Sequence, residues 1–362
     1  MTKLALGLMS GTSADGLTVS AVQVRPFKII HFKNYPYPPA LQQKLLNARR
    51  LRADELSALD YALGALYAKT VRRFLKEFHL TAQQIEVIGS HGQTVLHAPK
   101  ATTPHTLQIA EPSFLAAQLG VPVVSDFRAK DVALGGQGAP LIPFFDEYIW
   151  GKKGPKILLN IGGISNLSLV GKNRKTLGFD VGPGNTLMDL CAQRLLQKPF
   201  DTNGRTAAQG IPDKALVAQL IRQPFFAKRP PKSLDKNEFG PAYLSRHFAP
   251  FTRKRTADIL ATVTYFTAAA VADQITRFIQ KADQREIVVS GGGAYNQTLL
   301  SFLRELLPQT KITTSADYGI DPQAKESAAF ALFAWQALHG KANHCARATG
   351  ARKQTVLGKI TL

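Results

Sequence analysis

A glycine- and hydroxyl-rich turn near the amino terminus carries the residue types that bind an anion. It follows an apolar run over residues 4–9 and consists of Gly11, Thr12, Ser13, Ala14, Asp15, Gly16, Leu17 and Thr18. Glycine and short hydroxyl side chains let backbone N–H groups and side-chain donors close around a group such as a phosphate. Asp15-Gly16 between two apolar runs also predicts a β-hairpin, so an ordinary tight turn is the alternative interpretation.

Two more glycine-rich turns occur farther along the chain. Gly162 and Gly163 interrupt a second pair of apolar runs, in KILLNIGGISNLSLV. Gly291, Gly292 and Gly293 join a predicted strand to a predicted helix in EIVVSGGGAYNQTLL. Glycine lets a flat ligand approach the backbone closely, although a helix packed tightly on a sheet explains the triple glycine equally well. Taken together, the three turns predict a nucleotide held between two related domains.

An acidic residue lies where a predicted strand meets a predicted helix, in LGFDVGPGNTLMD. We expect the strand to end at Phe179, with Asp180 at its carboxyl tip. Gly182 and Gly184 then turn the chain into a helix that begins at Asn185. A carboxylate in this position can act as a base, while the exposed N–H groups of the helix bind an anion. An Asp that only caps the turn is the alternative.

Further hydrogen-bonding side chains gather on two loops. His91 and Thr94 follow a predicted strand in GSHGQTVLHAP, and Arg128 precedes a run of glycines in SDFRAKDVALGGQGAPL. Polar groups on glycine-rich loops are typical of ligand contacts. Arg128 could clamp a carboxylate through two parallel hydrogen bonds, or it could pair with Asp126 or Asp131 and only hold its loop.

The hydrophobic pattern alternates between strands and helices, which predicts an α/β protein with helices covering its sheets. Strands are expected at 4–8, 17–24, 85–88, 121–124, 157–161, 167–170 and 287–289. Helices are expected at 53–78, 112–119, 185–196, 258–280, 297–306 and 323–338. Glu326 opens the last of these helices, where an acid also complements the helix dipole. The proline-rich segment 201–255 is interpreted as a loop-rich insertion, and the apolar end of the basic tail as an edge strand.

Composition limits the function classes. The chain has 362 residues, of which 45% are hydrophobic, and this length favours two domains. We expect no charged leader and no apolar stretch of transmembrane length, hence a cytoplasmic protein. Cys191 and Cys345 form neither a disulfide framework nor a metal-binding pair. The formal charge is +20, but the cations are scattered and match no nucleic-acid motif, so a solvated basic surface is the preferred interpretation.

Seven motifs together resemble the anhydro-N-acetylmuramic acid kinases: MSGTSADG, GSHGQTVLHAP, SDFRAKDVALGGQGAPL, NIGGISN, FDVGPGNTLMD, SGGGAYN and GIDPQAKESAAF. They occur in the order of that family and span the chain from Leu4 to about Trp335. The resemblance implies a two-domain actin-like ATPase (ribonuclease H-like) fold with the active site in the interdomain cleft. It also implies a cytoplasmic enzyme of cell-wall recycling that forms a homodimer, acts on a small molecule, and binds neither nucleic acid nor a membrane. The first domain is expected at 1–125 plus 335–362 and the second at 126–334.

The implied reaction uses ATP and Mg²⁺ to convert 1,6-anhydro-N-acetylmuramate and water into N-acetylmuramate 6-phosphate and ADP. Residues 11–18 match the ATP-phosphate loop of the family and Asp180 its general base; no metal ligand is assigned. The glycines at 162–163, 182, 184 and 291–293 are assigned to ATP. His91, Thr94 and Arg128 are assigned to the sugar, and Glu326 matches a substrate-side acid of the family.

Two departures from the family pattern leave alternatives open. Thr18 stands where the family usually has a second acid, and residues 232–237 read KSLDKN where it usually has KSTGRE. A kinase of the same fold that acts on another anhydro sugar, such as levoglucosan, is one alternative. A catalytically impaired nucleotide-binding homologue is another, and the +20 charge keeps a nucleic-acid binder as a third.

Overall fold

The computed structural model describes residues 3–152, 154–171, 177–230, 232–234, 238–248 and 255–362. Its contacts divide the chain into two compact units. Unit 1 comprises residues 1–145 and 323–362, and unit 2 comprises residues 146–322. These bounds differ from the expected 125/126 and 334/335, because the whole of helix α12 (Lys325–Leu338) packs on strands of unit 1. The basic group at 172–175 and the departure at 235–237 lie outside the described residues.

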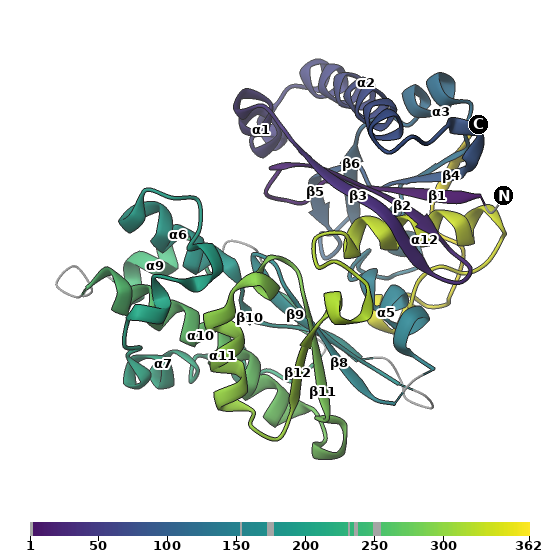
Figure 1. The fold of residues 1–362 in the computed structure, drawn as a ribbon. Coiled ribbons are helices and arrows are strands. Elements are labelled where there is room, and N and C mark those ends of the chain that lie inside the picture. Colours follow the sequence, from purple (N-terminus) through teal and green to yellow (C-terminus); the bar gives the residue numbers. More distant parts are fainter. Residues whose placement is uncertain (1–2, 153, 172–176, 231, 235–237, 249–254) are drawn as a thin grey trace. The chain divides into compact units, whose positions relative to one another are not determined.

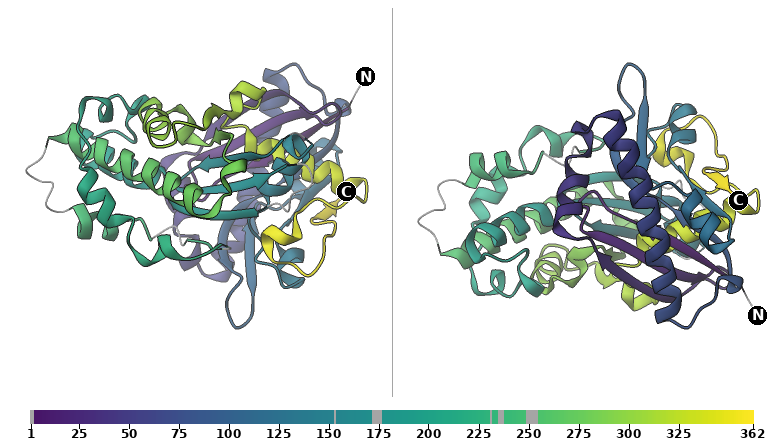
Figure 2. Two further views of the ribbon diagram at one scale, coloured as in Figure 1. Left: turned by 90° about the horizontal axis from the view of Figure 1, so that it is seen from below. Right: turned by 90° about the horizontal axis from the view of Figure 1, so that it is seen from above.

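Unit 1 is built on a six-stranded sheet with the order β13-β7-β4-β1-β2-β3. Strands β1, β2 and β3 form an antiparallel meander, whereas β4 and β7 continue the sheet parallel to β1. The C-terminal strand β13 adds antiparallel to β7 at the edge (Figure 2), as predicted for the apolar tail. The strands are β1 (Leu4–Met9), β2 (Gly16–Gln23), β3 (Lys28–Pro36), β4 (Ile85–Ser90), β7 (Val123–Ser125) and β13 (Lys359–Thr361). A separate antiparallel pair consists of β5 (Gln93–Ala98) and β6 (His105–Ile109).

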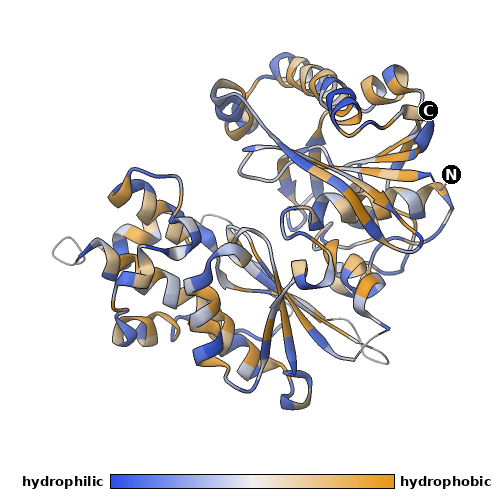
Figure 3. Ribbon diagram, viewed as in Figure 1, coloured by the Kyte–Doolittle hydropathy of each residue, from blue (hydrophilic) through white to orange (hydrophobic). Residues whose placement is uncertain are grey.

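Helices cover both faces of this sheet (Figure 1). On one face lie α2 (Ala53–Glu77) and α3 (Ser113–Leu119), and α2 alternates hydrophobic and hydrophilic residues along its turns (Figure 3). On the other face α12 approaches so closely that a Cβ atom at Gly7 or Gly89 would collide with its backbone. Glycine at these two positions therefore lets α12 lie directly on β1 and β4. The remaining helices of unit 1 are α1 (Pro39–Leu46), α4 (Ala129–Ala133) and α13 (Ala346–Thr349), and α5 (Ile142–Trp150) contains the division between the units.

Unit 2 contains a five-stranded sheet with the order β10-β9-β8-β11-β12. Strands β8, β9 and β10 form an antiparallel meander, and β11 and β12 continue parallel to β8. Unit 1 repeats this arrangement, since β1 corresponds to β8 and β4 to β11. The shared order is the ribonuclease H-like topology expected of an actin-like ATPase, so the predicted internal symmetry is confirmed. The strands are β8 (Lys156–Ile161), β9 (Ile164–Val170), β10 (Leu177–Pro183), β11 (Glu286–Ser290) and β12 (Lys311–Thr314).

The core of unit 2 forms where α6, α10 and α11 pack against its sheet. Helix α10 (Thr256–Phe278) is long and apolar enough to cross a membrane by composition, contrary to the expectation that no stretch has this length. Of its most apolar stretch of 18 residues, 89% is buried inside the protein, as in a core helix. The other helices are α6 (Asn185–Leu196), α7 (Lys214–Leu220), α8 (Pro224–Ala227), α9 (Pro241–Phe248) and α11 (Gln297–Leu306).

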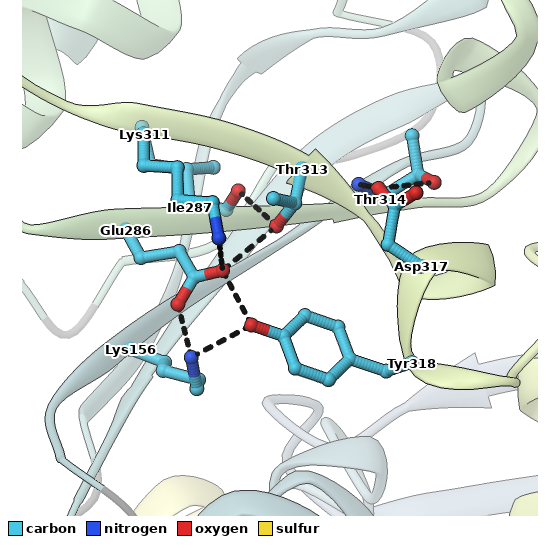
Figure 4. Close-up of polar contacts among 8 residues, drawn as sticks. All are labelled: Lys156, Glu286, Ile287, Lys311, Thr313, Thr314, Asp317 and Tyr318. Atoms are coloured by element: carbon cyan, nitrogen blue, oxygen red, sulfur yellow. Dashed lines mark hydrogen bonds and ion pairs between the residues drawn. The ribbon is translucent and has the colours of Figure 1, made fainter.

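A buried ion pair joins the amino ends of the central strands of unit 2 (Figure 4). The Lys156 ammonium donates to the Glu286 carboxylate, which also accepts from the hydroxyls of Tyr318 and Thr313. The side chains of Lys156 and Glu286 are 11% and 13% exposed. Burial alone raises the pKa of Glu286, but the hydrogen bonds from Lys156 and Tyr318 outweigh it and lower that pKa below its usual value.

We predict that Glu286→Gln lowers the free energy of unfolding by about 3–5 kcal/mol, because it leaves the buried Lys156 charge unpaired. The matched control is Lys311→Met, which removes a 70% exposed lysine whose ammonium lies 3.8 Å from the same carboxylate and costs less than about 1 kcal/mol. Because the folded-state pKa of Glu286 is depressed, its contribution is present above the unfolded pKa of about 4.3 and is lost as the pH falls through the folded value. Urea denaturation at several pH values measures both effects, and equal losses in the two variants would contradict this account.

Candidate functional site

The amino-terminal turn presents polar side chains to solvent at the end of β1. Thr12, Ser13 and Asp15 are exposed, whereas Ala14, Gly16 and Leu17 are buried. The Leu17 side chain belongs to the hydrophobic core of unit 1, so only its backbone can face a ligand. Strands β1 and β2 flank the turn as an antiparallel pair, which confirms the predicted hairpin. Exposed hydroxyls and one carboxylate are thus the side chains that this turn offers.

A buried amide from β5 holds the turn in place. Gln93 is 2% exposed, accepts from the Ser10 hydroxyl at 2.6 Å, and donates to the Gly11 carbonyl at 3.0 Å. On the outer side, the Gln42 amide donates to the Ser13 carbonyl at 3.2 Å. Hydrogen bonds therefore tie the turn to both β5 and α1. The Thr18 hydroxyl, at the base of the hairpin, donates to Asn34 of β3 at 3.2 Å.

His91 and Arg128 are brought together although they lie far apart in the sequence. They follow β4 and β7, which are parallel, so both residues emerge at the same edge of the sheet. The Nε and Nη2 atoms of Arg128 lie 3.0 and 2.9 Å from His91 Nε2, and Nη1 donates to the Gly138 carbonyl at 2.7 Å. His91 Nδ1 lies 2.9 Å from the Gly92 carbonyl and so carries the ring proton. The neutral imidazole thereby accepts from Arg128 and orients the guanidinium.

Burial shifts the pKa values of His91, Arg128 and Glu326. Burial, reinforced by the Arg128 charge, lowers the pKa of His91 to about 3. Burial also lowers the pKa of Arg128 to about 10, while the charge of Glu326 opposes this change. Burial raises the pKa of Glu326, and Arg128 counteracts that increase. Glu326, in the first turn of α12, is half-buried and close enough to Arg128 for the two charges to interact. The cluster therefore contains a cation and an acid beside a neutral histidine.

The partners of Arg128 exclude pairing with Asp126 or Asp131 among the described residues, although its contact with Gly138 does hold the loop. Within the described part of the chain, its guanidinium bonds to His91 and Gly138 and to neither Asp126 nor Asp131. Asp126 instead pairs with Lys359 at 2.6 Å, and Asp131 accepts from the Gly138 N–H and the Thr349 hydroxyl. Arg128 therefore keeps N–H donors that these contacts do not use, as a carboxylate-binding residue requires.

Thr94 is not part of that cluster. It lies on β5 and accepts from the Gln108 amide at 3.4 Å. Among the sugar-binding residues predicted from sequence, the structure thus groups His91, Arg128 and Glu326 and places Thr94 on a neighbouring strand pair.

Asp180 lies inside β10, not at the tip of a strand. The strand continues to Pro183, and its pairing with β9 shifts between Asp180 and Gly182. The Asp180 carboxylate accepts from the Leu234 N–H at 2.7 Å, and the Asp180 N–H donates to the Lys232 carbonyl at 3.0 Å. Burial raises the pKa of Asp180 to about 6; the Leu234 hydrogen bond lowers it, and the charge of Glu238 raises it. A carboxylate with this pKa is a base that is ionised at neutral pH.

The N–H groups at the start of α6 are not free to bind an anion, contrary to the expectation. Those of Gly184, Asn185 and Thr186 donate to the carbonyls of Gly162 and Gly163 at 2.7–3.3 Å. The turn between β8 and β9 therefore caps the helix. Gly182 is explained by packing, because a Cβ atom there would lie 3.0 Å from the Cβ atom of Ala270.

The triple glycine permits close packing at the end of β11. Gly291 has a φ of 77°, and Cβ atoms at Gly291 and Gly293 would lie 2.4–2.7 Å from atoms of Asn160 and Ile161. The packing explanation therefore holds for these two positions. Gly292 is exposed, and a Cβ atom there would lie 3.1 Å from the Asn185 amide. Since β8 and β11 are parallel, the glycine turns that follow them share one edge of the sheet.

Sequence reasoning gave no role to Gln93 or Lys232, which contact Gly11 and Asp180, and it did not single out Asp189. Asp189 on α6 is half-buried, and burial raises its pKa to about 7. The burial of these polar residues depends on helices and strands that are distant in the sequence, so the local pattern gave no signal for it. The described residues contain no group of three or more His, Cys, Asp or Glu that could hold a metal ion.

We predict that His91 stays neutral, with its proton on Nδ1, until the pH falls to about 3. Two-dimensional ¹⁵N–¹H NMR of histidine-labelled protein measures this, and His91→Asn identifies the resonance. A His91 imidazole that becomes doubly protonated near its ordinary pKa of about 6.5 would contradict its assignment as an acceptor for Arg128.

Comparison with known proteins extends these observations to the whole chain. The family model described as anhydro-N-acetylmuramic acid kinase matches residues 3–362. A protein of that name from Pasteurella multocida (strain Pm70) is 39% identical, with 98% of this chain and 96% of its own covered. Another from Variovorax paradoxus (strain S110) is 41% identical, with 99% and 98% covered. A third, from Actinobacillus pleuropneumoniae serotype 7 (strain AP76), is 38% identical, with 99% of both chains covered. Because both kinds of match span almost the entire sequence, this chain belongs to the anhydro-N-acetylmuramic acid kinase family.

Proposed function

We propose that this protein is a kinase that opens 1,6-anhydro-N-acetylmuramate with water and phosphorylates O6. The products are N-acetylmuramate 6-phosphate and ADP, and the reaction serves cell-wall recycling. The observation that carries this proposal is the half-buried carboxylate of Asp180, which is oriented by the Leu234 N–H and has a pKa raised to about 6. Family membership over residues 3–362 supports it. The names of the curated relatives favour this substrate over levoglucosan.

Asp180 acts as the general base. Its carboxylate accepts a proton from the water that attacks the anomeric carbon, and the O6 released from the anhydro bridge then takes the phosphoryl group from ATP. A base works best when its pKa lies slightly below the working pH, since it is then ionised and still basic. Burial supplies that raised pKa here.

Arg128 binds the lactyl carboxylate of the sugar. His91 and Gly138 fix the plane of the guanidinium, which lets its remaining N–H groups meet a carboxylate. A fixed guanidinium loses little conformational entropy on binding. Glu326 lies within reach of the Arg128 charge and contacts the sugar on the same side, as its match to the substrate-side acid of the family implies. His91 acts through Arg128 and not by direct contact, because its ring is buried and both nitrogens have partners.

The turn at residues 11–18 fits the phosphates of ATP with Mg²⁺. It presents the exposed Asp15 carboxylate and the exposed hydroxyls of Thr12 and Ser13. Mg²⁺ keeps several waters and binds one or two carboxylates together with nucleotide phosphates, so a single nearby acid is a sufficient donor set. When bound, the ion neutralises charge on the transferring phosphoryl group. The exposed Gly292 contributes a surface for the adenosine.

Thr18 provides no carboxylate, and its hydroxyl donates to Asn34. The Asp15 carboxylate of the same turn nevertheless stays exposed and can still bind Mg²⁺. We therefore favour an active kinase over an impaired homologue. We further propose that the enzyme is a cytoplasmic homodimer whose basic surface gathers anionic substrates and is not a nucleic-acid site.

An ADP-release assay with purified protein, ATP, Mg²⁺ and anhydro-N-acetylmuramate tests the function. We expect turnover by the unmodified protein, with an acidic limb near pH 6 in the profile of kcat, because protonation of Asp180 below its pKa removes the base. Asp180→Asn should lower kcat by about 10²–10⁴-fold, the usual contribution of a general base.

Asp189→Asn is the matched control, since Asp189 is another half-buried acid of unit 2, and burial raises its pKa to about 7. We expect this variant to keep the acidic limb near pH 6. Loss of the limb in Asp189→Asn, or full activity of Asp180→Asn, would overturn the assignment of the base. No turnover by the unmodified protein would favour the impaired homologue.

We also predict that Arg128→Ala raises KM for anhydro-N-acetylmuramate by about 10–100-fold, because a hydrogen-bonded charge pair contributes about 1.5–3 kcal/mol. The KM for 1,6-anhydro-N-acetylglucosamine, which lacks the lactyl group, should change little. Steady-state kinetics on both sugars measures the difference, with Lys130→Ala as an exposed cationic control. An equal loss on both sugars would show that Arg128 does not bind the carboxylate.

A further inference from the structure

A short segment outside the regular strands covers Asp180. Strand β10 is the edge of its sheet, and residues 232–234 run beside it at Asp180. The Asp180 N–H donates to the Lys232 carbonyl at 3.0 Å, and the Leu234 N–H donates to the Asp180 carboxylate at 2.7 Å. The segment thus contacts both the backbone and the side chain of Asp180. Whatever fixes the segment also fixes the direction of the carboxylate.

The Lys232 side chain ties this segment to the core of unit 2. Its ammonium donates to the Phe225 carbonyl at 3.1 Å and to the Gln274 side-chain oxygen. It also lies 4.4 Å from the ring centre of Phe225 and 5.2 Å from that of Phe278. Gln274 is fully buried on α10 and donates to the Phe226 carbonyl at 3.0 Å. The Lys232 ammonium is therefore held by groups of both α8 and α10.

These contacts hold the Lys232 ammonium more firmly than solvent holds the ammonium of an exposed lysine. Burial is the main reason that the pKa of Lys232 falls to about 8; Asp273 opposes the change, and Arg277 and Lys228 add to it. The two hydrogen bonds and the ring contacts hold a partly desolvated cation at one point. Its ammonium points to α10 while its own carbonyl pairs with β10, so one residue links the core helix to the strand that carries Asp180.

We propose that Lys232 is a positioning residue for Asp180: its ammonium, anchored on Gln274 and Phe225, holds the Leu234 N–H on the carboxylate. This inference rests on the proposed function, in which Asp180 is the base. Lys232 acts through the backbone, because the pKa of Asp180 is shifted by burial, by the Leu234 N–H and by the charge of Glu238, and the Lys232 charge is not among these causes. The Leu234 hydrogen bond stabilises the ionised carboxylate and so lowers its pKa.

The test compares Lys232→Met with Lys228→Met, an exposed neighbouring lysine. Loss of the contacts that the Lys232 ammonium makes with Gln274 and Phe225 should release the Leu234 N–H. The pKa of Asp180 should then rise from about 6 by about one pH unit. Carboxyl ¹³C NMR of aspartate-labelled protein measures this without any need for activity, with Asp180→Asn to identify the resonance. The acidic limb of the kcat profile should move to higher pH by the same amount, with KM for ATP unchanged. Lys228→Met should leave both unchanged.

The outcomes separate this inference from the proposed function. An unshifted Asp180 resonance in folded Lys232→Met would overturn the positioning role. An increase in KM for ATP with an unshifted limb would also overturn it, since Lys232 would then contact the nucleotide. A shifted resonance with an unshifted kinetic limb would support the positioning role and refute Asp180 as the base. If Lys232→Met does not fold, Lys232→Gln, which keeps an amide donor, is measured in the same way and is expected to give a smaller shift.

Discussion

Parallel pairing at the centre of each sheet is the constraint on which the site residues depend. In unit 1 it directs the ends of β1, β4 and β7 to one edge, where the amino-terminal turn, His91 and Arg128 emerge. The close packing of α12 on Gly7 and Gly89 brings Glu326 to the same group. In unit 2 the parallel strands β8 and β11 bring two glycine turns together in the same way. Ligands of open α/β sheets bind beyond the carboxyl ends of the strands. The strand pairing alone therefore determines which edge of each sheet binds a ligand, whatever side chains lie there.

Burial then sets the protonation of polar groups within each unit. A histidine that was protonated could not accept from an arginine, and desolvation keeps His91 neutral. The same effect raises the pKa of Asp180 toward the pH at which a base is effective. Each of these groups depends on a backbone partner, Gly92 for His91 and Leu234 for Asp180. A buried charge without such a partner would destabilise the fold.

The sequence predicted the parts of the fold that depend on local periodicity. The bounds expected for α6 and α11 agree with the structure, because both helices have a regular apolar face. Strand β3 was missed, since KIIHFKNYP mixes charged and apolar residues, and β10 was ended too early because its irregular pairing with β9 leaves no mark in the sequence. The site was predictable as a set of residue types but not as a set of contacts. That Arg128 rests on His91, and that the start of α6 is capped by the turn at 162–163, are long-range results of folding.

The central claim is that water opens the sugar while the phosphoryl group passes to the freed O6. Turnover in H₂¹⁸O, stopped within the first few cycles and analysed by fragment mass spectrometry, tests it most directly. Unlabelled product incubated in the same water corrects for exchange at the anomeric carbon. The account predicts ¹⁸O on the anomeric carbon of the sugar phosphate and none in its phosphoryl group. Labelled inorganic phosphate beside an intact anhydro sugar would contradict it, because the water would then have attacked the nucleotide.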